Sequence, residues 1–210
     1  MNDDYHFEVN KERPEEIYHD VRDYFKGKTL FDYANSKNIM RIQQKITLRA
    51  LELLEFPNKN SLILDAGCGP GFASLLLKEM GYNVVSIDLI EQFLLFYELG
   101  DVNPITADMC SLPFKESLFD GVISISALQW IFKERKNQKM EIDLIRLVKN
   151  FYTILKLGSK AVIQFYPKNS LIMKRIGHLI SDNTSFRGNF VIDNPEIPKI
   201  RKIFLILSKE

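Results

Sequence analysis

The residues with the clearest chemical potential lie around position 65. Asp65 is followed by Gly67, Gly69 and Gly71 in the run Asp-Ala-Gly-Cys-Gly-Pro-Gly, directly after the apolar residues 61–64. Glycines let a ligand approach the backbone closely, and a helix that follows them presents unpaired N–H groups. The run therefore predicts a nucleotide-type binding loop. A dinucleotide site typically has the spacing G-x-G-x-x-G, whereas the spacing here is G-x-G-x-G.

Two further acids follow later apolar runs. Asp88 ends the run 83–87, 21 residues after Gly67, where an acid suits the ribose hydroxyls of dinucleotide and adenosyl sites alike. Asp108 follows a third run, and in adenosylmethionine sites such an acid accepts the adenine amino group beside an apolar neighbour, here Met109. Taken singly, each acid is more simply a helix cap or a loop carboxylate. Their order, followed by the apolar run 119–125, resembles the class I methyltransferases.

Apolar runs and helical periods alternate around these residues, which is typical of a parallel sheet covered on both faces. The helix-rich sequence before residue 60, above all 39–54, is expected to pack over the cofactor end. We predict one structural domain, with a helical extension at 1–58 and a catalytic part at 59–210. The predicted strands are 61–64, 83–87, 103–106, 119–125, 160–165 and 202–207, and the predicted helices are 72–80, 90–99, 140–155 and 171–180.

The resemblance implies an α/β, Rossmann-like fold with a mostly parallel seven-stranded sheet. It implies that S-adenosylmethionine is the cofactor and S-adenosylhomocysteine the product. The residues expected to bind the cofactor are Tyr33, Asp65, Gly67, Cys68, Gly69, Gly71, Asp88, Leu89, Asp108, Met109, Ser124 and Ala127.

Two segments resemble a narrower family, the small-subunit ribosomal RNA guanine-N7 methyltransferases of eukaryotes and their archaeal relatives. These are 123–130, Ile-Ser-Ile-Ser-Ala-Leu-Gln-Trp, and 164–170, Gln-Phe-Tyr-Pro-Lys-Asn-Ser. Tyr33, Gln43 and the run 49–54 also match that family at its spacing. The resemblance implies methyl transfer to a guanine N7, a nitrogen with a free lone pair. No general base is then needed, and we predict no catalytic residue.

The substrate is expected at the ends of the fourth and fifth strands. Trp130, Phe165 and Tyr166 are aromatic residues that could sandwich a flat base, worth about 1–3 kcal/mol per base. Gln129 and Pro167 complete the predicted substrate set. The alternative is that 124–130 simply packs the edge of the sheet.

The composition is that of an ordinary globular protein, and 210 residues fit one domain. No apolar run is long enough to cross a bilayer and no signal-peptide pattern is present, so a soluble cytoplasmic protein is expected. Cys68 and Cys110 form no CxxC pair and the three histidines are scattered, so we predict no metal site.

The net charge of +1 conceals an asymmetry. Residues 1–125 hold 12 Lys and Arg against 20 Asp and Glu, whereas residues 126–210 hold 16 against 7. The basic half indicates either a surface that faces nucleic acid or charge pairing between the two halves.

The segment 89–99 is unusually apolar, with eight hydrophobic residues in eleven. It is either buried by the N-terminal helices or part of a protein interface. The resemblance implies an interface, because family members pair with a small zinc-binding activator subunit that adds a strand beside the third strand. We therefore expect small-subunit rRNA and this subunit as partners, and neither DNA nor a membrane.

Other functions compete with this one. A small-molecule methyltransferase of the same fold would use residues 1–55 as a lid. A cofactor-binding ribosome assembly factor would act mainly through its binding. A nicotinamide-dependent dehydrogenase is disfavoured by the glycine spacing and by Asp108.

Overall fold

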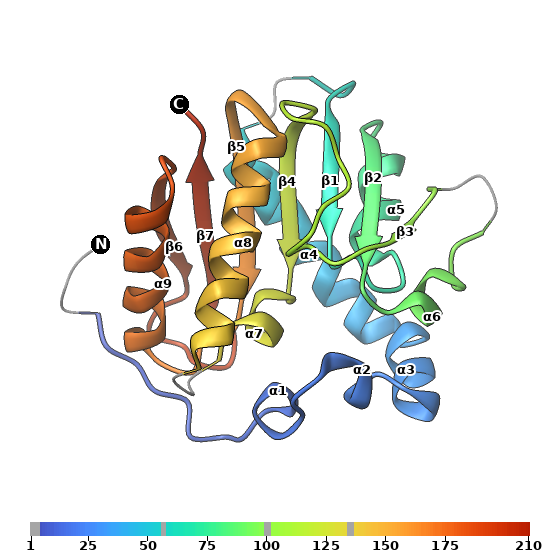
Figure 1. The fold of residues 1–210 in the computed structure, drawn as a ribbon. Coiled ribbons are helices and arrows are strands. Elements are labelled where there is room, and N and C mark those ends of the chain that lie inside the picture. Colours follow the sequence, from blue (N-terminus) through green and yellow to red (C-terminus); the bar gives the residue numbers. More distant parts are fainter. Residues whose placement is uncertain (1–4, 56–57, 99–101, 134–136) are drawn as a thin grey trace.

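A seven-stranded sheet forms the centre of the molecule (Figure 1). The computed structural model describes residues 5–55, 58–98, 102–133 and 137–210. The strand order is β3-β2-β1-β4-β5-β7-β6; strands β1 to β5 are parallel, and β7 runs antiparallel to β5 and β6. This confirms the mostly parallel seven-stranded sheet. The strands are β1 (Leu62–Ala66), β2 (Asn83–Asp88), β3 (Ile105–Thr106), β4 (Phe119–Ile125), β5 (Leu155–Phe165), β6 (Arg187–Asp193) and β7 (Lys202–Ser208).

Helices cover both faces of this sheet. In Figure 1, α8 (Gln138–Ile154) and α9 (Ser170–Asn183) lie in front of the sheet, and α4 (Lys37–Leu54) and α5 (Phe72–Glu79) lie behind it. Five short helices complete the described part of the chain: α1 (Pro14–Ile17), α2 (Val21–Tyr24), α3 (Gly27–Ala34), α6 (Glu91–Leu94) and α7 (Leu128–Ile131). The first three run beneath the carboxyl ends of the parallel strands (Figure 1).

The apolar strands explain why the sheet needs cover on both sides. Successive residues of a strand point to opposite faces of the sheet. Two apolar residues in a row therefore contribute one side chain to the core on each face. Leu64 and Val122 join the cluster beneath α8 and α9, whereas their neighbours Ile63 and Ile123 join the cluster beneath α4 and α5. All four side chains are fully buried.

The N-terminal helices pack at the carboxyl edge of the sheet. Leu30 of α3 forms a small apolar cluster with Ile90 and Phe93, and Phe25 and Tyr33 pack against it. This cluster buries much of the apolar segment 89–99. Leu95 lies outside it and is 80% exposed, and Leu99 lies outside the described residues.

The structure corrects the predicted elements in four places. The predicted helix 90–99 is only the short α6 (Glu91–Leu94) in the structure. The Phe93 side chain is buried, and the chain turns at 95–97 instead of continuing the helix. Strand β5 begins at Leu155 rather than at 160, and β3 has two residues rather than four. Strand β6 is missing from the predicted elements, since its residues are exposed or half-buried and show no apolar run.

Candidate active site

A pocket at the carboxyl edge lies where the strand order reverses. From β1 the chain goes outward to β2 on one side, and β4 lies on the other. Ligands of open α/β sheets bind at this switch point. The pocket has about 700 Å³ of empty space, its open mouth included. Its walls come from the glycine loop, from the ends of β2 and β4, and from the N-terminal helices.

The glycine loop closes tightly on its neighbours. Gly67 and Gly69 have φ values of +81° and +53°, which L side chains rarely adopt. A Cβ on Gly67 would stand 2.7 Å from the Cβ of Ala127. The backbone N–H groups of Gly67 and Cys68 both donate to the carbonyl of Ile87, at 2.9 and 3.0 Å. The loop is therefore held against β2, and only a residue without a side chain fits beside β4.

Asp88 ends β2 inside this pocket. Its carboxylate accepts a hydrogen bond from the N–H of Gly69 at 2.7 Å and another from the N–H of Ile90 at 2.8 Å. Burial raises the pKa of Asp88, and these backbone hydrogen bonds counteract the rise. Each carboxylate oxygen can accept further hydrogen bonds, so Asp88 has capacity left for a ligand's hydroxyl groups.

Asp65 has a different role from Asp88. It is 1% exposed, and its carboxylate accepts a hydrogen bond from the Ser74 hydroxyl at 2.5 Å. The Ser86 hydroxyl donates to Ser74 at 2.7 Å, and the Tyr97 hydroxyl lies 3.3 Å from the same oxygen. Burial raises the pKa of Asp65 to about 7. This chain of hydroxyl groups ties the end of β1 to α5 and β2, behind the pocket.

Aromatic side chains form one wall of the pocket. Phe25 lies 5.1 Å from the ring centroid of Tyr33, 5.1 Å from that of Phe93 and 5.7 Å from that of Trp130. All four residues line the pocket. Aromatic faces attract cations, so this wall suits a positively charged ligand group.

These residues fit S-adenosylmethionine. Asp88 can accept the ribose hydroxyls, and Asp108 lines the pocket together with the apolar Leu89 and Met109, as an adenine site needs. The aromatic wall suits the sulfonium, which carries a positive charge. At Gly67 no side chain stands between the loop and the pocket, so a bound cofactor would contact the backbone of the loop directly.

Most of the predicted cofactor residues meet at this pocket. Eight line it, namely Tyr33, Gly67, Gly69, Asp88, Leu89, Asp108, Met109 and Ala127. Asp65 and Cys68 line a smaller adjoining pocket instead. Gly71 and Ser124 line neither of these two pockets. Gly71 begins α5 with Tyr97 packed against it, and the Ser124 hydroxyl donates to the carbonyl of Ala66 at 2.8 Å.

The predicted substrate residues do not form a single site. Trp130 lines the cofactor pocket, where it contacts Tyr24 and Phe25. Phe165 also lines a second cavity together with Tyr166 and Pro167, but it is only 1% exposed and belongs to the core, so its ring has almost no exposed face for a base. The predicted sandwich of Trp130, Phe165 and Tyr166 is therefore wrong, because β5 turns the Phe165 ring into the sheet core.

The other three substrate residues line a smaller pocket beside α1. Gln129, Tyr166 and Pro167 share it with Glu15, and Gln129 donates from its amide nitrogen to the carbonyl of Ser126 at 2.7 Å. The side-chain oxygen Oε1 of Gln129 is buried, with no hydrogen-bond partner among the described residues. Burial raises the pKa of Glu15.

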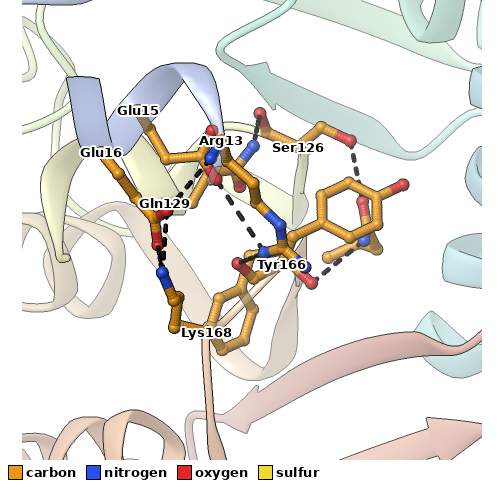
Figure 2. A network of polar contacts seen from close by, with 9 residues as sticks. Arg13, Glu15, Glu16, Ser126, Gln129, Tyr166 and Lys168 are labelled. Carbon is orange, nitrogen blue, oxygen red and sulfur yellow. Dashed lines mark hydrogen bonds and ion pairs between the residues drawn. The ribbon is translucent and has the colours of Figure 1, made fainter. Parts of the chain in front are cut away.

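A polar network fastens the N-terminal segment over the end of β5 (Figure 2). The Arg13 guanidinium donates to the carbonyl of Tyr166, and the Arg13 N–H donates to the Glu16 carboxylate at 3.0 Å. Glu16 also forms an ion pair with Lys168 at 2.9 Å. Residues 5–20, which we call the N-terminal strap, thus lie across the substrate side of the sheet.

Sequence reasoning missed Val21 and Phe25 in the pocket wall and Glu15 beside Gln129. Phe25 lies in the aromatic pair Tyr24-Phe25 just before Gly27, which is the only sequence signal that marked this segment. Short helices such as α2 carry too few residues for an apolar period to be visible.

The titratable groups that line the main pocket are few: Tyr33, Asp88 and Asp108. Burial, together with the nearby charge of Asp88, raises the pKa of Tyr33 to about 12, so this hydroxyl keeps its proton at neutral pH. If both acids hold the cofactor, no described lining residue remains to accept a proton from a substrate.

Known proteins resemble the chain in both sequence and fold. Residues 64–163 match the model of a methyltransferase domain. The 18S rRNA (guanine-N(7))-methyltransferase of Bos taurus is 36% identical over 203 residues, which cover 92% of this chain and 68% of that protein. The 18S rRNA (guanine(1575)-N(7))-methyltransferase of Saccharomyces cerevisiae is 36% identical, covering 93% and 72%. The chain belongs to the 18S rRNA (guanine-N7)-methyltransferase family.

Membership of this family makes the chain an S-adenosylmethionine-dependent methyltransferase, which confirms the predicted enzyme class and cofactor. A solved structure of phosphoethanolamine N-methyltransferase 2 from Haemonchus contortus, with S-adenosylhomocysteine bound, has the same fold. It superposes with a TM-score of 0.70 at 17% identity, covering 90% of this chain and 58% of that one. Within the described residues, no helix is long and apolar enough to cross a membrane, and no group of three potential ligands suits a metal.

Proposed function

We propose that this family member transfers the methyl group of S-adenosylmethionine to N7 of a guanine in small-subunit ribosomal RNA. The names of its relatives support the acceptor. The observation that carries the proposal is the lack of a proton acceptor among the described residues of the pocket once Asp88 and Asp108 hold the cofactor. Guanine N7 suits such a site, because its lone pair attacks without losing a proton.

Positioning would then supply most of the catalysis. When bound, S-adenosylmethionine supplies an electrophilic methyl group and leaves as a neutral thioether. Asp88 and the loop at Gly67 fix the cofactor, while Trp130 and Ser126 line the same pocket beyond it, at the end of β4. The protonated Tyr33 cannot act as a base. Aligning two reactants in a pocket from which water is excluded lowers the barrier without proton transfer.

The test is methyl transfer from radiolabelled S-adenosylmethionine to purified small-subunit rRNA, followed by mapping of the modified nucleotide. We expect label at a guanine N7 and none with Asp88→Ala. Label at another atom or base, or incorporation into no RNA even with an activator subunit present, would contradict the proposal. Intact ribosome assembly with Asp88→Ala would instead favour an assembly factor whose catalysis is secondary.

A small-molecule acceptor is the second candidate. Val21, Phe25 and Phe93 give the pocket an apolar wall supplied in part by the N-terminal helices, as a lid over a small substrate would. Methylation of a small molecule in a cell extract, with no label in rRNA, would favour this alternative.

We further propose that a small zinc-binding activator subunit pairs with β3. In the described part of the chain β3 pairs only with β2, so its outer edge is open to strand addition. Ile105 of β3 itself is 39% exposed, and Leu95, which follows α6, is 80% exposed. Exposed apolar side chains of this kind favour a protein interface.

Leu95→Asp tests this interface without disturbing the core. Co-expression of the chain with the activator subunit should give a heterodimer, and Leu95→Asp should weaken it. Leu171→Asp is a matched control, because Leu171 is 69% exposed at the start of α9. A free chain that is monomeric, stable and binds S-adenosylmethionine at full strength would argue against an obligatory partner.

A further inference from the structure

A second large cavity lies on the same sheet edge, on the far side of Tyr166 from α1 and Gln129. It has about 590 Å³ of empty space, its open mouth included. Among the described residues, four cationic side chains and no carboxylate line it. The cations are Arg13 from the strap, Lys199 and Arg201 from the segment before β7, and Lys202, the first residue of β7.

The positive charge of this cavity is hardly compensated by neighbouring acids. Among the described residues, no carboxylate forms an ion pair with Lys199, Arg201 or Lys202. Arg13 lies 3.9 Å from the Glu15 carboxylate, at the limit of an ion pair. A concave surface lined by one sign of charge focuses its field and concentrates ligands of the opposite sign. The cavity therefore suits an anion.

Aromatic rings hold three of these cations, Arg13, Arg201 and Lys202, in place. The Lys202 ammonium lies 5.4 Å from the centroid of the Tyr166 ring, and the Arg13 guanidinium lies 5.7 Å from it. Arg201 lies 4.8 Å from the centroid of Phe7 and also donates to the carbonyl of Pro195. Side chains that are already positioned lose less conformational freedom when they bind, which strengthens binding.

The cavity adjoins the small pocket beside α1, with which it shares Arg13, Tyr166 and Pro167. Gln129 lines that small pocket, and the next residue, Trp130, lines the cofactor pocket. Glu15 and Glu16 also line the small pocket, so the cationic cavity, and not the small pocket, is the place for an anion. All three hollows lie toward the carboxyl edge of the sheet, where an RNA strand is long enough to reach both the cofactor pocket and the cavity.

We propose that this cationic cavity, lined by Arg13, Lys199, Arg201 and Lys202, binds phosphate groups of the RNA backbone that flank the methylated nucleotide. The inference rests on the proposed RNA substrate. The cavity reads no base, because its polar lining consists mainly of cationic donors, which recognise phosphate oxygens. It should therefore bind RNA of any sequence and fix the strand relative to the cofactor.

The test compares two double variants by the salt dependence of RNA binding. Lys199→Gln/Lys202→Gln removes two cations from the cavity. Lys115→Gln/Lys149→Gln is the matched control: both lysines are exposed and lie near the amino ends of β4 and β5, at the opposite edge. The probe is a fluorescein-labelled single-stranded RNA of mixed sequence, titrated over a range of KCl. Calorimetry of S-adenosylhomocysteine binding checks that each variant is folded.

We expect Lys199→Gln/Lys202→Gln to weaken RNA binding several-fold for all sequences alike. The plot of log affinity against log salt should be less steep by about 1.4, about 0.7 for each lost phosphate contact on a single strand. Binding of S-adenosylhomocysteine should not change, and the control variant should behave as wild type. Competition by inorganic phosphate only at concentrations far above those of RNA would identify the strand, rather than a free phosphate, as the ligand.

Failure of this inference differs from failure of the proposed function. If wild type methylates rRNA but the cavity variant binds RNA like the control, the cavity is not the backbone site. If RNA binding is weaker in the cavity variant yet wild type methylates no RNA, the cavity stands and the acceptor is wrong. If wild type binds no RNA, both are overturned.

Discussion

The two large pockets on the carboxyl edge of the sheet carry opposite charge. Among the described residues, the cofactor pocket is lined by Asp88 and Asp108 and by no cation, whereas the cavity beyond Tyr166 is lined by four cations and no acid. The ligands proposed for them differ in the same sense, because S-adenosylmethionine bears a sulfonium cation and RNA is a polyanion. Under these proposals, one sheet edge serves two ligands by a change in the sign of its side chains.

This difference has the same sign as the charge asymmetry of the sequence. The acids of the cofactor pocket lie in residues 1–125, where Asp and Glu outnumber Lys and Arg by 20 to 12. Three of the four cavity cations lie in residues 126–210, where Lys and Arg outnumber Asp and Glu by 16 to 7. Both interpretations of this asymmetry have support in the structure. The cavity suits nucleic acid. Ion pairs also join acids of the first half to lysines of the second, namely Glu16 to Lys168, Glu55 to Lys160 and Asp120 to Lys156.

The largest expected effect is on cofactor affinity, when the Asp88 carboxylate of the cofactor pocket is removed. Asp88→Ala should remove the acceptor of the ribose hydroxyls, at a loss of about 3–6 kcal/mol for two hydrogen bonds to a charged group. Cofactor affinity, measured by calorimetry, should fall by roughly a hundredfold to ten-thousandfold. RNA affinity should stay the same. Asp182→Ala, exposed on α9, is the control, and an equal loss there would remove the special role of Asp88.

The buried acid behind the cofactor pocket, Asp65, should affect how the stability of the fold depends on pH. Burial raises its pKa to about 7, so between about pH 4 and 7 the folded chain binds more protons than the unfolded chain. The contribution of Asp65 to stability is therefore present at low pH and is lost as the pH rises to about 7. Denaturant unfolding of the free chain should show this loss, up to about 4 kcal/mol across the window. Asp65→Asn should remove that component; an unchanged pH dependence would contradict the assignment.

A smaller effect should come from the loop itself. Gly67→Ala should destabilise the chain by about 1–3 kcal/mol, because its new Cβ would stand 2.7 Å from that of Ala127. Gly69→Ala is a matched control, since its φ is also positive but nothing lies within 4 Å of its Cβ. Adding Ala127→Gly should recover part of the loss in Gly67→Ala only. Equal destabilisation by both alanines would show that φ strain alone, and not the clash, decides.

Much of the fold was predictable because its signals are local. The apolar runs of β1, β2, β4 and β7 and the apolar periods of α8 and α9 need only their own sequence to be recognised. Strand β6 was not, since its pairing with β7 depends on a partner distant in sequence and its residues are at most half-buried. The helix predicted at 90–99 failed because tertiary packing of Phe93 and Ile90 decides that segment.

The site was predictable to a similar degree. Asp88, Asp108 and the glycines were found because a parallel sheet gathers the carboxyl ends of its strands at one edge. The prediction that Phe165 contacts a base was wrong. The sequence shows that Phe165 ends a strand, but it does not show to which face of the sheet its side chain points. The cavity cations went unnoticed as a set, since Arg13 meets Lys199 and Lys202 only in the folded chain.

The most direct test of the division between the two pockets is a steady-state measurement of methyl transfer to small-subunit rRNA, with both substrate concentrations varied. We expect Asp88→Asn to raise the KM for S-adenosylmethionine while the KM for RNA stays at the wild-type value. Lys199→Gln/Lys202→Gln should do the reverse. If either variant raised both KM values equally, or if the two effects were exchanged, the acidic and cationic pockets would not hold the separate ligands assigned to them.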